Sequence, residues 1–147
     1  MDIRKLTDEV SVAPQIAVED IAALAAAGFK TLMCNRPSNE ELGQPETDAI
    51  VTEAKALGLN WVHLPVVGGQ MDMSHVEGFR AALSEQAMPM LAYCRSGTRS
   101  STLWALAEAP TRDTDEIIDA CAAAGYNYEG MRGSLDSMKA ELNSRSS

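Results

Sequence analysis

The sequence predicts one α/β domain across residues 1–147, with a parallel-rich central sheet and helices on both of its faces. Short apolar runs of strand length alternate along the chain with longer segments of helical periodicity. Repeated strand–helix units place successive strands parallel and put the connecting helices on the sheet faces. A chain of 147 residues is also long enough to form one hydrophobic core.

Four apolar segments have the length of buried strands and are separated by Gly, Pro or polar turns. In order they are "VSVAP", "KTLMCN", "NWVHLPV" and "MPMLAYC". The last segment is the most apolar, which predicts that it lies deepest in the sheet. Cys94 is its final residue.

Helical periodicity follows these strands. The expected helices are "VEDIAALAAAG", "ETDAIVTEAKALG", residues 74–86, "STLWALAEA", "TDEIIDACAAAG" and roughly residues 135–142. Gly28 and Gly58 are C-terminal stops. Ser74 and Glu77 have capping-box spacing, and Asp113 begins a similar pattern. "STLWALAEA" is apolar on nearly every face, which indicates a buried helix.

Composition excludes several functional classes. A net charge of -9 argues against a nucleic-acid or anionic membrane partner, and no apolar run is long enough to span a bilayer. The N-terminal "MDIRKLTDEV" lacks the apolar core of a secretion signal. Three cysteines favour a reducing, cytoplasmic compartment over a disulfide framework. His63 and His75 lack ligand-type neighbours at metal-site spacing, so neither a metal nor a cofactor is expected.

The loop after Cys94 has the composition of an anion site. In a parallel sheet, functional residues gather where strands end, and a helix N-terminus follows here. Its free N–H groups and dipole favour a thiolate, the reactive form of cysteine. Gly97 lets the backbone N–H groups converge. The candidate loop is Arg95, Ser96, Gly97, Thr98, Arg99 and Ser100. A packed thiol before an ordinary turn is the structural alternative.

"YCRSGTRS" resembles both the active-site loop of rhodanese sulfurtransferases and the phosphate loop of cysteine-based protein phosphatases. Together with "TLMCNRPSNEELGQP", "HLPV" and "LAYCRSGTRSSTLWALA", it resembles the β-lactamase-hydrolase-like, phosphatase-like domain family, from about Val10 to Ala109. The resemblance implies a dual-specificity-phosphatase-like fold. It also implies either phosphatase-like chemistry or a sulfur transferase of sulfide detoxification, with a persulfide-oxidising enzyme as partner.

The Cys–Arg spacing favours sulfur chemistry. The phosphatase pattern has five residues between Cys and Arg, which would put Arg at position 100, where Ser100 stands. Arg99 matches the shorter spacing that the resemblance associates with rhodaneses. A narrower ring suits the outer sulfur of a persulfide. The main hypothesis is therefore a sulfurtransferase, in which Cys94 takes sulfur from thiosulfate or a low-molecular-weight persulfide and passes it to a thiol.

Two other functions stay open. In a phosphatase, Cys94 attacks a phosphate ester, Arg99 binds the phosphoryl oxygens, and Asp72 is the candidate general acid. Asp72 is also explained as a solvated residue near a helix start. In the third hypothesis the loop is an anion-binding or redox-sensing site without catalysis. All three expect a small anionic ligand or a reactive thiol.

Arg36 and Cys34 leave the neighbouring strand at the same edge of the predicted sheet. Arg36 is expected either on the substrate side of the pocket or in a salt bridge with Glu40 or Glu41. Cys34 is expected as a buried strand-end thiol rather than a group that resolves a persulfide. Cys121, among apolar helix residues, is expected in the core.

Overall fold

The structure is a computed structural model that describes the backbone of residues 1–146 and the side chains of residues 1–140. A five-stranded sheet with the order β1-β2-β5-β3-β4 forms its centre. The strands are β1 (Arg4–Lys5), β2 (Val10–Ala13), β3 (Thr31–Cys34), β4 (Asn60–His63) and β5 (Met90–Tyr93). Only β1 is antiparallel to its neighbour, so the predicted parallel-rich α/β sheet is confirmed.

β1 is absent from the sequence prediction. It consists of two residues, Arg4 and Lys5, which pair with Val12 and Ser11 of β2. Two polar side chains leave no apolar pattern to detect, and the backbone pairing alone defines this strand.

β5 lies between β2 and β3, and all four of its residues are buried. Its last residue, Tyr93, is in register with Ala13 of β2 and Cys34 of β3. Three parallel strands therefore end side by side at one edge of the sheet. The prediction that the most apolar strand lies deepest is confirmed, and it places Cys94 at the middle of that edge.

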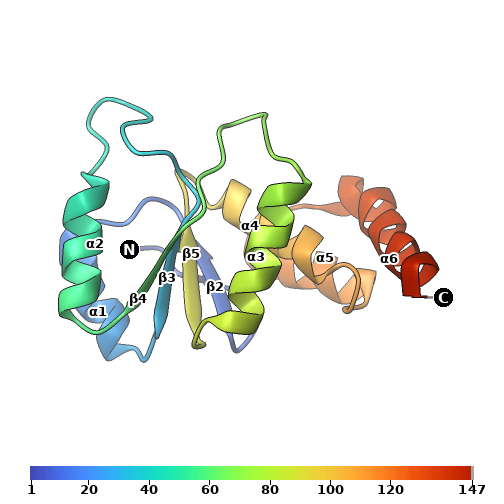
Figure 1. The fold of residues 1–147 in the computed structure, drawn as a ribbon, viewed down its shortest axis with the longest axis horizontal. Helices are drawn as coiled ribbons and strands as arrows, with labels where there is room; N and C mark the ends of the chain where they lie inside the picture. The colour runs from blue at the N-terminus through green and yellow to red at the C-terminus, as the bar shows by residue number, and fades with distance from the viewer. Residues whose placement is uncertain (147) are drawn as a thin grey trace.

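Helices cover both faces of the sheet, as predicted. They are α1 (Ile21–Ala26), α2 (Thr47–Ala56), α3 (Met73–Glu85), α4 (Thr98–Glu108), α5 (Thr114–Ala123) and α6 (Arg132–Ser146). Two 3-10 turns, η1 (Val18–Asp20) and η2 (Glu129–Met131), precede α1 and α6. α1 and α2 lie on one side of the sheet, and the remaining helices lie on the other (Figure 1).

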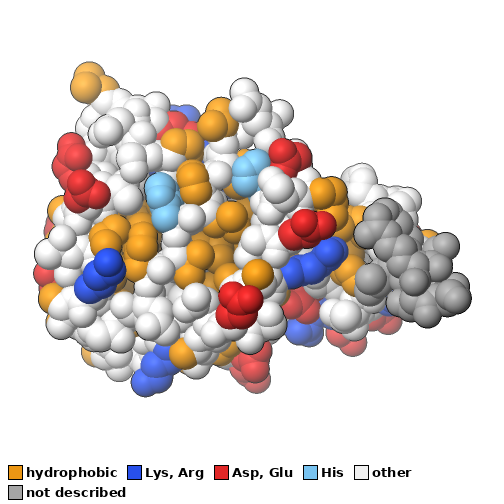
Figure 2. All heavy atoms as spheres, in the orientation of Figure 1, with side chains coloured by type: hydrophobic (Ala, Val, Ile, Leu, Met, Phe, Trp, Pro, Cys, Tyr) orange, Lys and Arg blue, Asp and Glu red, His pale blue; other side chains and the backbone are white. Residues whose placement is uncertain are grey.

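Alternation along β5 divides the core between the two faces. Leu91 and Tyr93 pack with residues of α1 and α2, whereas Met90 and Ala92 pack with residues of α3 to α6. Successive strand side chains point to opposite faces, so one apolar strand supplies both cores. Figure 2 shows further hydrophobic side chains between α2 and α3, over the edge strand β4.

The beginning of α3 differs from its prediction. Asp72, rather than Ser74, is the N-cap: its side chain accepts a hydrogen bond from the Ser74 backbone N–H at 2.9 Å. The Ser74 hydroxyl also donates to the Asp72 carboxylate, so the expected capping group is itself bound by the cap. A carboxylate accepts several N–H and O–H donors at once, which suits it to this position.

Four connections leave the sheet at the edge where Cys94 lies. Residues 35–46 join β3 to α2, residues 64–72 join β4 to α3, residues 94–97 join β5 to α4, and residues 14–17 join β2 to η1. The first two rise above this edge of the sheet in Figure 1. Within the described residues, no helix is both long and apolar enough to cross a membrane.

Candidate active site

Cys94 directly follows β5 and is 0% exposed. Its backbone N–H donates to the Ala13 carbonyl at 3.3 Å, which continues the pairing with β2 by one residue. The chain then turns back, and the Gly97 N–H donates to Cys94 Sγ at 3.1 Å. The sulfur therefore receives a backbone donor from its own loop, a contact that supports negative charge on it.

Gly97 is the N-cap of α4 and has a φ of 89°, in the left-handed region. A side chain there is strained for any L residue. A Cβ at this position would also collide with the hydroxyl of Tyr126. Glycine is required for both reasons, and the sharp turn allows α4 to begin at Thr98, one residue later.

Arg99 lies in the first turn of α4, and its guanidinium binds Glu40 of the β3–α2 connection. Nη1 donates to Oε2 at 2.7 Å and Nη2 donates to Oε1 at 2.8 Å. Nη1 also donates to the Val66 carbonyl of the β4–α3 connection at 2.6 Å. Hydrogen bonds from Arg99, reinforced by Arg36, hold the pKa of Glu40 at about 2 against the effect of burial.

Arg36 is 1% exposed and forms the salt bridges that the sequence left as one of two alternatives. Its Nε donates to Glu40 Oε1 at 2.9 Å, and its Nη1 donates to Gln15 Oε1 at 2.9 Å. Nη2 lies 2.9 Å from Glu41 Oε1 without the alignment of a hydrogen bond. Arg36 thus pairs with both Glu40 and Glu41 and holds these two carboxylates in place.

Arg95 is 67% exposed, and its Nε lies 3.4 Å from the second carboxylate, Glu41. Glu40 and Glu41 thereby link Arg36, Arg95 and Arg99 into one network. Three guanidinium groups face two carboxylates, so the network keeps one net positive charge beside Cys94. This single positive charge is local, because the chain as a whole carries a net charge of -9.

The hydroxyls of the loop bind one another or its neighbours. Ser96 Oγ donates to Thr98 Oγ1 at 3.0 Å and accepts from the Thr98 N–H at 3.3 Å. Ser100 is buried, and its Oγ donates to Asn35 Oδ1 at 2.8 Å. Ser100 belongs to the loop expected to bind an anion, and in the structure this bond ties α4 to the residue that follows β3.

Asp72 is a helix cap whose side chain is 66% exposed. Hydrogen bonds from Ser74 lower the pKa of the Asp72 carboxyl. A general acid must carry a proton at the pH of catalysis, so a lowered pKa is unfavourable for that role. The geometry favours the helix-start explanation that the sequence also left open.

The two remaining cysteines occupy buried positions, as expected. Cys34 Sγ donates to the Arg36 carbonyl at 3.2 Å, and burial raises the pKa of its thiol. Burial also raises the pKa of Cys121 to about 12. Both are neutral thiols at physiological pH, unlike a nucleophile.

Three residues of the site were not predicted in their roles. Glu40 was named only as a partner for Arg36, and its bond to Arg99 was missed. Tyr126 and Tyr128, in "GYNYEG" after α5, donate hydrogen bonds to carbonyls of the Cys94 loop. The alternating tyrosines are a visible signal in the sequence, but nothing local places them beside residue 96.

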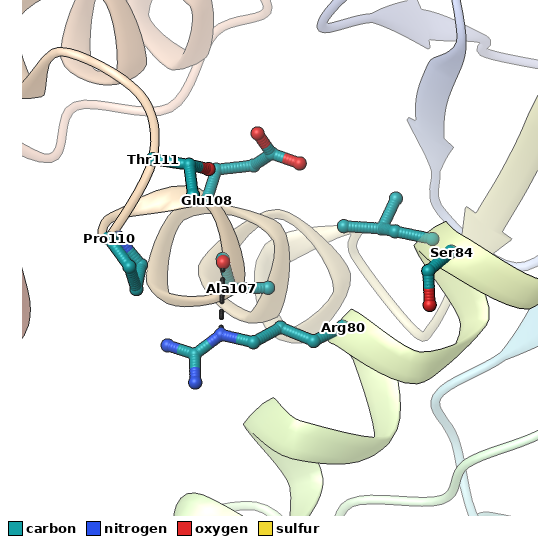
Figure 3. Close-up of a pocket in the computed structure, with 7 residues that line it drawn as sticks. Arg80, Ser84, Ala107, Glu108, Pro110 and Thr111 are labelled. Carbon is teal, nitrogen blue, oxygen red and sulfur yellow. Dashed lines mark hydrogen bonds between the residues drawn. The ribbon is translucent and has the colours of Figure 1, made fainter. Parts of the chain in front are cut away.

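A separate hollow lies between α3 and the C-terminal end of α4, lined by residues such as Arg80, Glu108 and Pro110 (Figure 3). Arg80 Nε donates to the Ala107 carbonyl at 3.1 Å there and so caps the end of α4. Among the described residues, no cluster of three or more His, Cys, Asp and Glu residues could hold a metal ion.

Comparison with protein families matches residues 2–111 to the model of the beta-lactamase hydrolase-like protein, phosphatase-like domain. A beta-lactamase hydrolase-like protein of Agrobacterium fabrum is 32% identical over 105 residues, which cover 71% of this chain and 24% of that protein. The chain therefore spans about a quarter of the length of the curated relatives it matches.

Solved structures agree with this assignment. A candidate phosphatase of Neisseria meningitidis is 38% identical, with a TM-score of 0.82 over 94% of this chain and 99% of that one. The catalytic domain of the PP-IP phosphatase SIW14 from Saccharomyces cerevisiae, solved with citrate, has a TM-score of 0.67. It is 15% identical over 99% of this chain and 93% of that one, a likeness of fold alone.

The sulfurtransferase hypothesis is wrong: the phosphatase-like family and the solved candidate phosphatase at 38% identity support its phosphatase alternative. The spacing argument considered only the chain between Cys94 and Arg99. Glu40 and Val66, from two other connections, also bind the Arg99 guanidinium, so loop length alone does not set the size of the site. The sulfide-metabolism setting and the persulfide-oxidising partner lose their support with that hypothesis. The chain belongs to the family of the beta-lactamase hydrolase-like protein, phosphatase-like domain.

Proposed function

We propose that this chain is a cysteine-dependent phosphatase that hydrolyses small phosphate monoesters through a phosphocysteine at Cys94. The observation that carries the proposal is the Gly97 N–H donating to Cys94 Sγ at 3.1 Å, with Arg99 in the first turn of the helix that follows. The family and the candidate phosphatase at 38% identity support the same chemistry.

In the first step, the Cys94 thiolate attacks phosphorus and the bond to the ester oxygen breaks. The leaving oxygen departs as an oxyanion that takes its proton from solvent, and the phosphoryl group remains on sulfur. In the second step, water attacks phosphorus, the phosphorus–sulfur bond breaks, and inorganic phosphate leaves with the thiolate restored. Backbone N–H groups at the start of α4 stabilise the charge on the equatorial oxygens.

Arg99 is the group suited to hold two of those oxygens, because its planar fork matches a phosphoryl group. In the structure, Nη1 and Nη2 of this fork bind Glu40, and Cys94 is fully buried. A phosphate ester therefore meets Arg99 through the N–H groups that Glu40 and Val66 do not use, while Glu40 holds the plane of the guanidinium.

The state of Asp72 bears on the substrate class. An exposed, ionised helix cap gives the leaving group no proton. Esters whose leaving group departs without protonation are then the better substrates, which favours aryl phosphates over alkyl phosphates.

The test is turnover of p-nitrophenyl phosphate by the purified chain and by Cys94→Ser. Wild type is expected to release phosphate, and Cys94→Ser to lose at least about 100-fold in kcat/KM, the usual cost of removing a nucleophile. Acid quenching followed by intact mass should find one phosphoryl group on wild type and none on Cys94→Ser. Equal turnover by the two proteins, or none by wild type, contradicts the proposal.

A further inference from the structure

We propose that Tyr126 and Tyr128 are positioning residues, which orient two peptide groups of the Cys94 loop so that their N–H groups face the anion site. Both tyrosines follow α5 and lie outside residues 2–111, the part of the chain that the family model matches. The inference rests on the proposed function for its effect on catalysis. Its effect on the Cys94 sulfur can be measured without any turnover.

The first contact joins Tyr126 to the sulfur through a single peptide group. The Tyr126 hydroxyl donates to the Ser96 carbonyl at 3.1 Å. The N–H of that same peptide group belongs to Gly97 and donates to Cys94 Sγ at 3.1 Å. Hydroxyl, peptide group and sulfur thus lie in series, and hydrogen bonds in series polarise one another. The hydroxyl therefore strengthens the donor that the sulfur receives.

The second contact acts on the peptide group that carries the Arg99 N–H. The Tyr128 hydroxyl lies 3.2 Å from the Thr98 carbonyl and 2.6 Å from Ser101 Oγ. Thr102 Oγ1 donates to the same hydroxyl at 3.1 Å. Ser101 Oγ lies 2.8 Å from the Gly97 carbonyl.

Each hydroxyl has one proton to donate. If Tyr128 donates to Thr98, it holds the loop carbonyl directly. If it donates to Ser101, the Ser101 proton goes to the Gly97 carbonyl at 2.8 Å or to the Thr98 carbonyl at 3.1 Å. In both arrangements a proton is directed at a carbonyl of the loop, on the side opposite to the N–H groups.

The two tyrosines are themselves well held. Their rings are stacked, with centroids 6.1 Å apart and planes inclined by 18°. The Arg4 guanidinium lies 5.1 Å from the Tyr126 ring centroid, and its Nη1 donates to the Ala124 carbonyl at 3.3 Å. Burial raises the pKa of both tyrosine hydroxyls, so both remain protonated donors at neutral pH.

A packing role alone does not account for these contacts. Tyr126 is 8% exposed and belongs to the core, a role that a phenylalanine ring also fills. Both hydroxyls instead approach main-chain oxygens of one short loop. The Tyr126 hydroxyl also occupies the space that a Cβ on Gly97 would need. Removing the hydroxyl while keeping the ring separates positioning from packing.

The experiment measures the pH dependence of Cys94 alkylation by iodoacetamide in the full chain. The lost hydrogen bond is one peptide group away from the sulfur and acts by polarising the Gly97 N–H, so the Tyr126→Phe profile should shift slightly to higher pH and alkylation below its midpoint should slow about twofold. Tyr128→Phe should leave the profile unchanged, because neither the Thr98 nor the Gly97 carbonyl shares a peptide group with the N–H that contacts Cys94 Sγ. It should instead weaken inhibition by inorganic phosphate.

Thr114→Val is the matched control for general destabilisation. Its hydroxyl donates to Asp136 at 2.6 Å, between α5 and α6 and away from the loop. This variant should lower the thermal unfolding midpoint and leave the alkylation profile in place. If Tyr126→Phe shifts only the unfolding midpoint, as Thr114→Val does, the positioning role is overturned.

A second variant keeps the test valid if Tyr126→Phe does not fold. Fluorotyrosine inserted at position 126 retains the ring and makes the hydroxyl a stronger donor, so the profile should shift to lower pH. An unchanged profile contradicts the inference. Alkylation requires no phosphate chemistry: a chain that lacks phosphatase activity but shows both shifts refutes the proposed function and not the role of Tyr126.

Discussion

Glu40 and Arg99 share two hydrogen bonds, of 2.7 and 2.8 Å, although they are 59 positions apart in the chain. Glu40 belongs to the β3–α2 connection and Arg99 to the first turn of α4. A bidentate pair fixes the plane of a guanidinium as well as its position. The orientation of Arg99 therefore depends on a loop from another strand, and that loop is anchored in turn by Arg36.

Glu40→Gln should lower kcat for an aryl phosphate about tenfold, with a smaller change in KM. The amide cannot accept both guanidinium N–H groups, so Arg99 loses its orientation while Cys94 stays in place. Glu41→Gln is the control, because Glu41 pairs with Arg36 and the exposed Arg95 only, and kcat should stay within about twofold. Equal losses in the two variants contradict this role for Glu40.

Stability should depend on pH through Glu40. The folded chain holds the pKa of Glu40 at about 2, below the ordinary value of 4.5, so folding favours the ionised form. The stabilisation is then complete above pH about 4.5 and is lost as the pH falls toward 2. Urea unfolding should find a constant difference between wild type and Glu40→Gln from neutral pH to about pH 5, and a shrinking one below. If the difference in unfolding free energy between wild type and Glu40→Gln does not shrink below about pH 5, this prediction is contradicted.

Arg99→Lys should reduce kcat/KM for an aryl phosphate by at least about tenfold, because an ammonium cannot form the two parallel bonds of the guanidinium. Arg95→Lys is its control: Arg95 is largely exposed, and its pair with Glu41 is long at 3.4 Å. That variant should keep activity within about twofold. Steady-state kinetics of both proteins check the prediction, and a strong effect of Arg95→Lys alone would reverse the assignment.

Asp72→Asn should leave turnover of an aryl phosphate within about twofold and leave stability nearly unchanged, because asparagine is also a good N-cap. Asp72→Ala removes the cap of α3 and should cost about 1 kcal/mol in the free energy of unfolding. Kinetics and urea unfolding measure the two effects. A tenfold or greater loss of kcat in a stable Asp72→Asn would restore Asp72 as the general acid.

Gly97→Ala should destabilise the chain by more than about 1 kcal/mol, because Gly97 has a φ of 89° and its new Cβ meets the Tyr126 hydroxyl. In a Tyr126→Phe background the substitution should cost less, since the colliding hydroxyl is gone, although the backbone strain and a close 3.2 Å approach to the ring carbon Cζ remain. A double-mutant cycle in urea measures this coupling. Additive effects contradict direct contact between the two positions.

Much of the architecture could be predicted from local patterns. The alternation of apolar strands and periodic helices predicted the parallel sheet and both of its covered faces. The apolar character of "MPMLAYC" predicted that β5 lies deepest, and the structure places it between β2 and β3. The glycine at position 97 predicted a turn with inward N–H groups, and its N–H does donate to Cys94 Sγ.

Sequence reasoning was less successful where several chain segments meet. The choice of sulfur over phosphate relied on the count of residues from Cys94 to Arg99, and it was wrong. That count measures one loop, whereas the partners of Arg99 come from two others. The start of α3 is a smaller example. Asp72 and Ser74 are both residue types that cap helices, and only the backbone conformation of the folded chain shows that Asp72 is the cap.

The sequence by itself determined the helices and the four apolar strands, the deepest strand, and the place of Cys94 at a strand end before a helix. These features depend on hydrophobic periodicity and turn chemistry, which are local properties of the chain. Only the tertiary structure decided which carboxylate holds Arg99 and which hydroxyl supports the Ser96 carbonyl. Those contacts span 59 and 30 positions, and they depend on how loops from separate strands converge at one edge of the sheet.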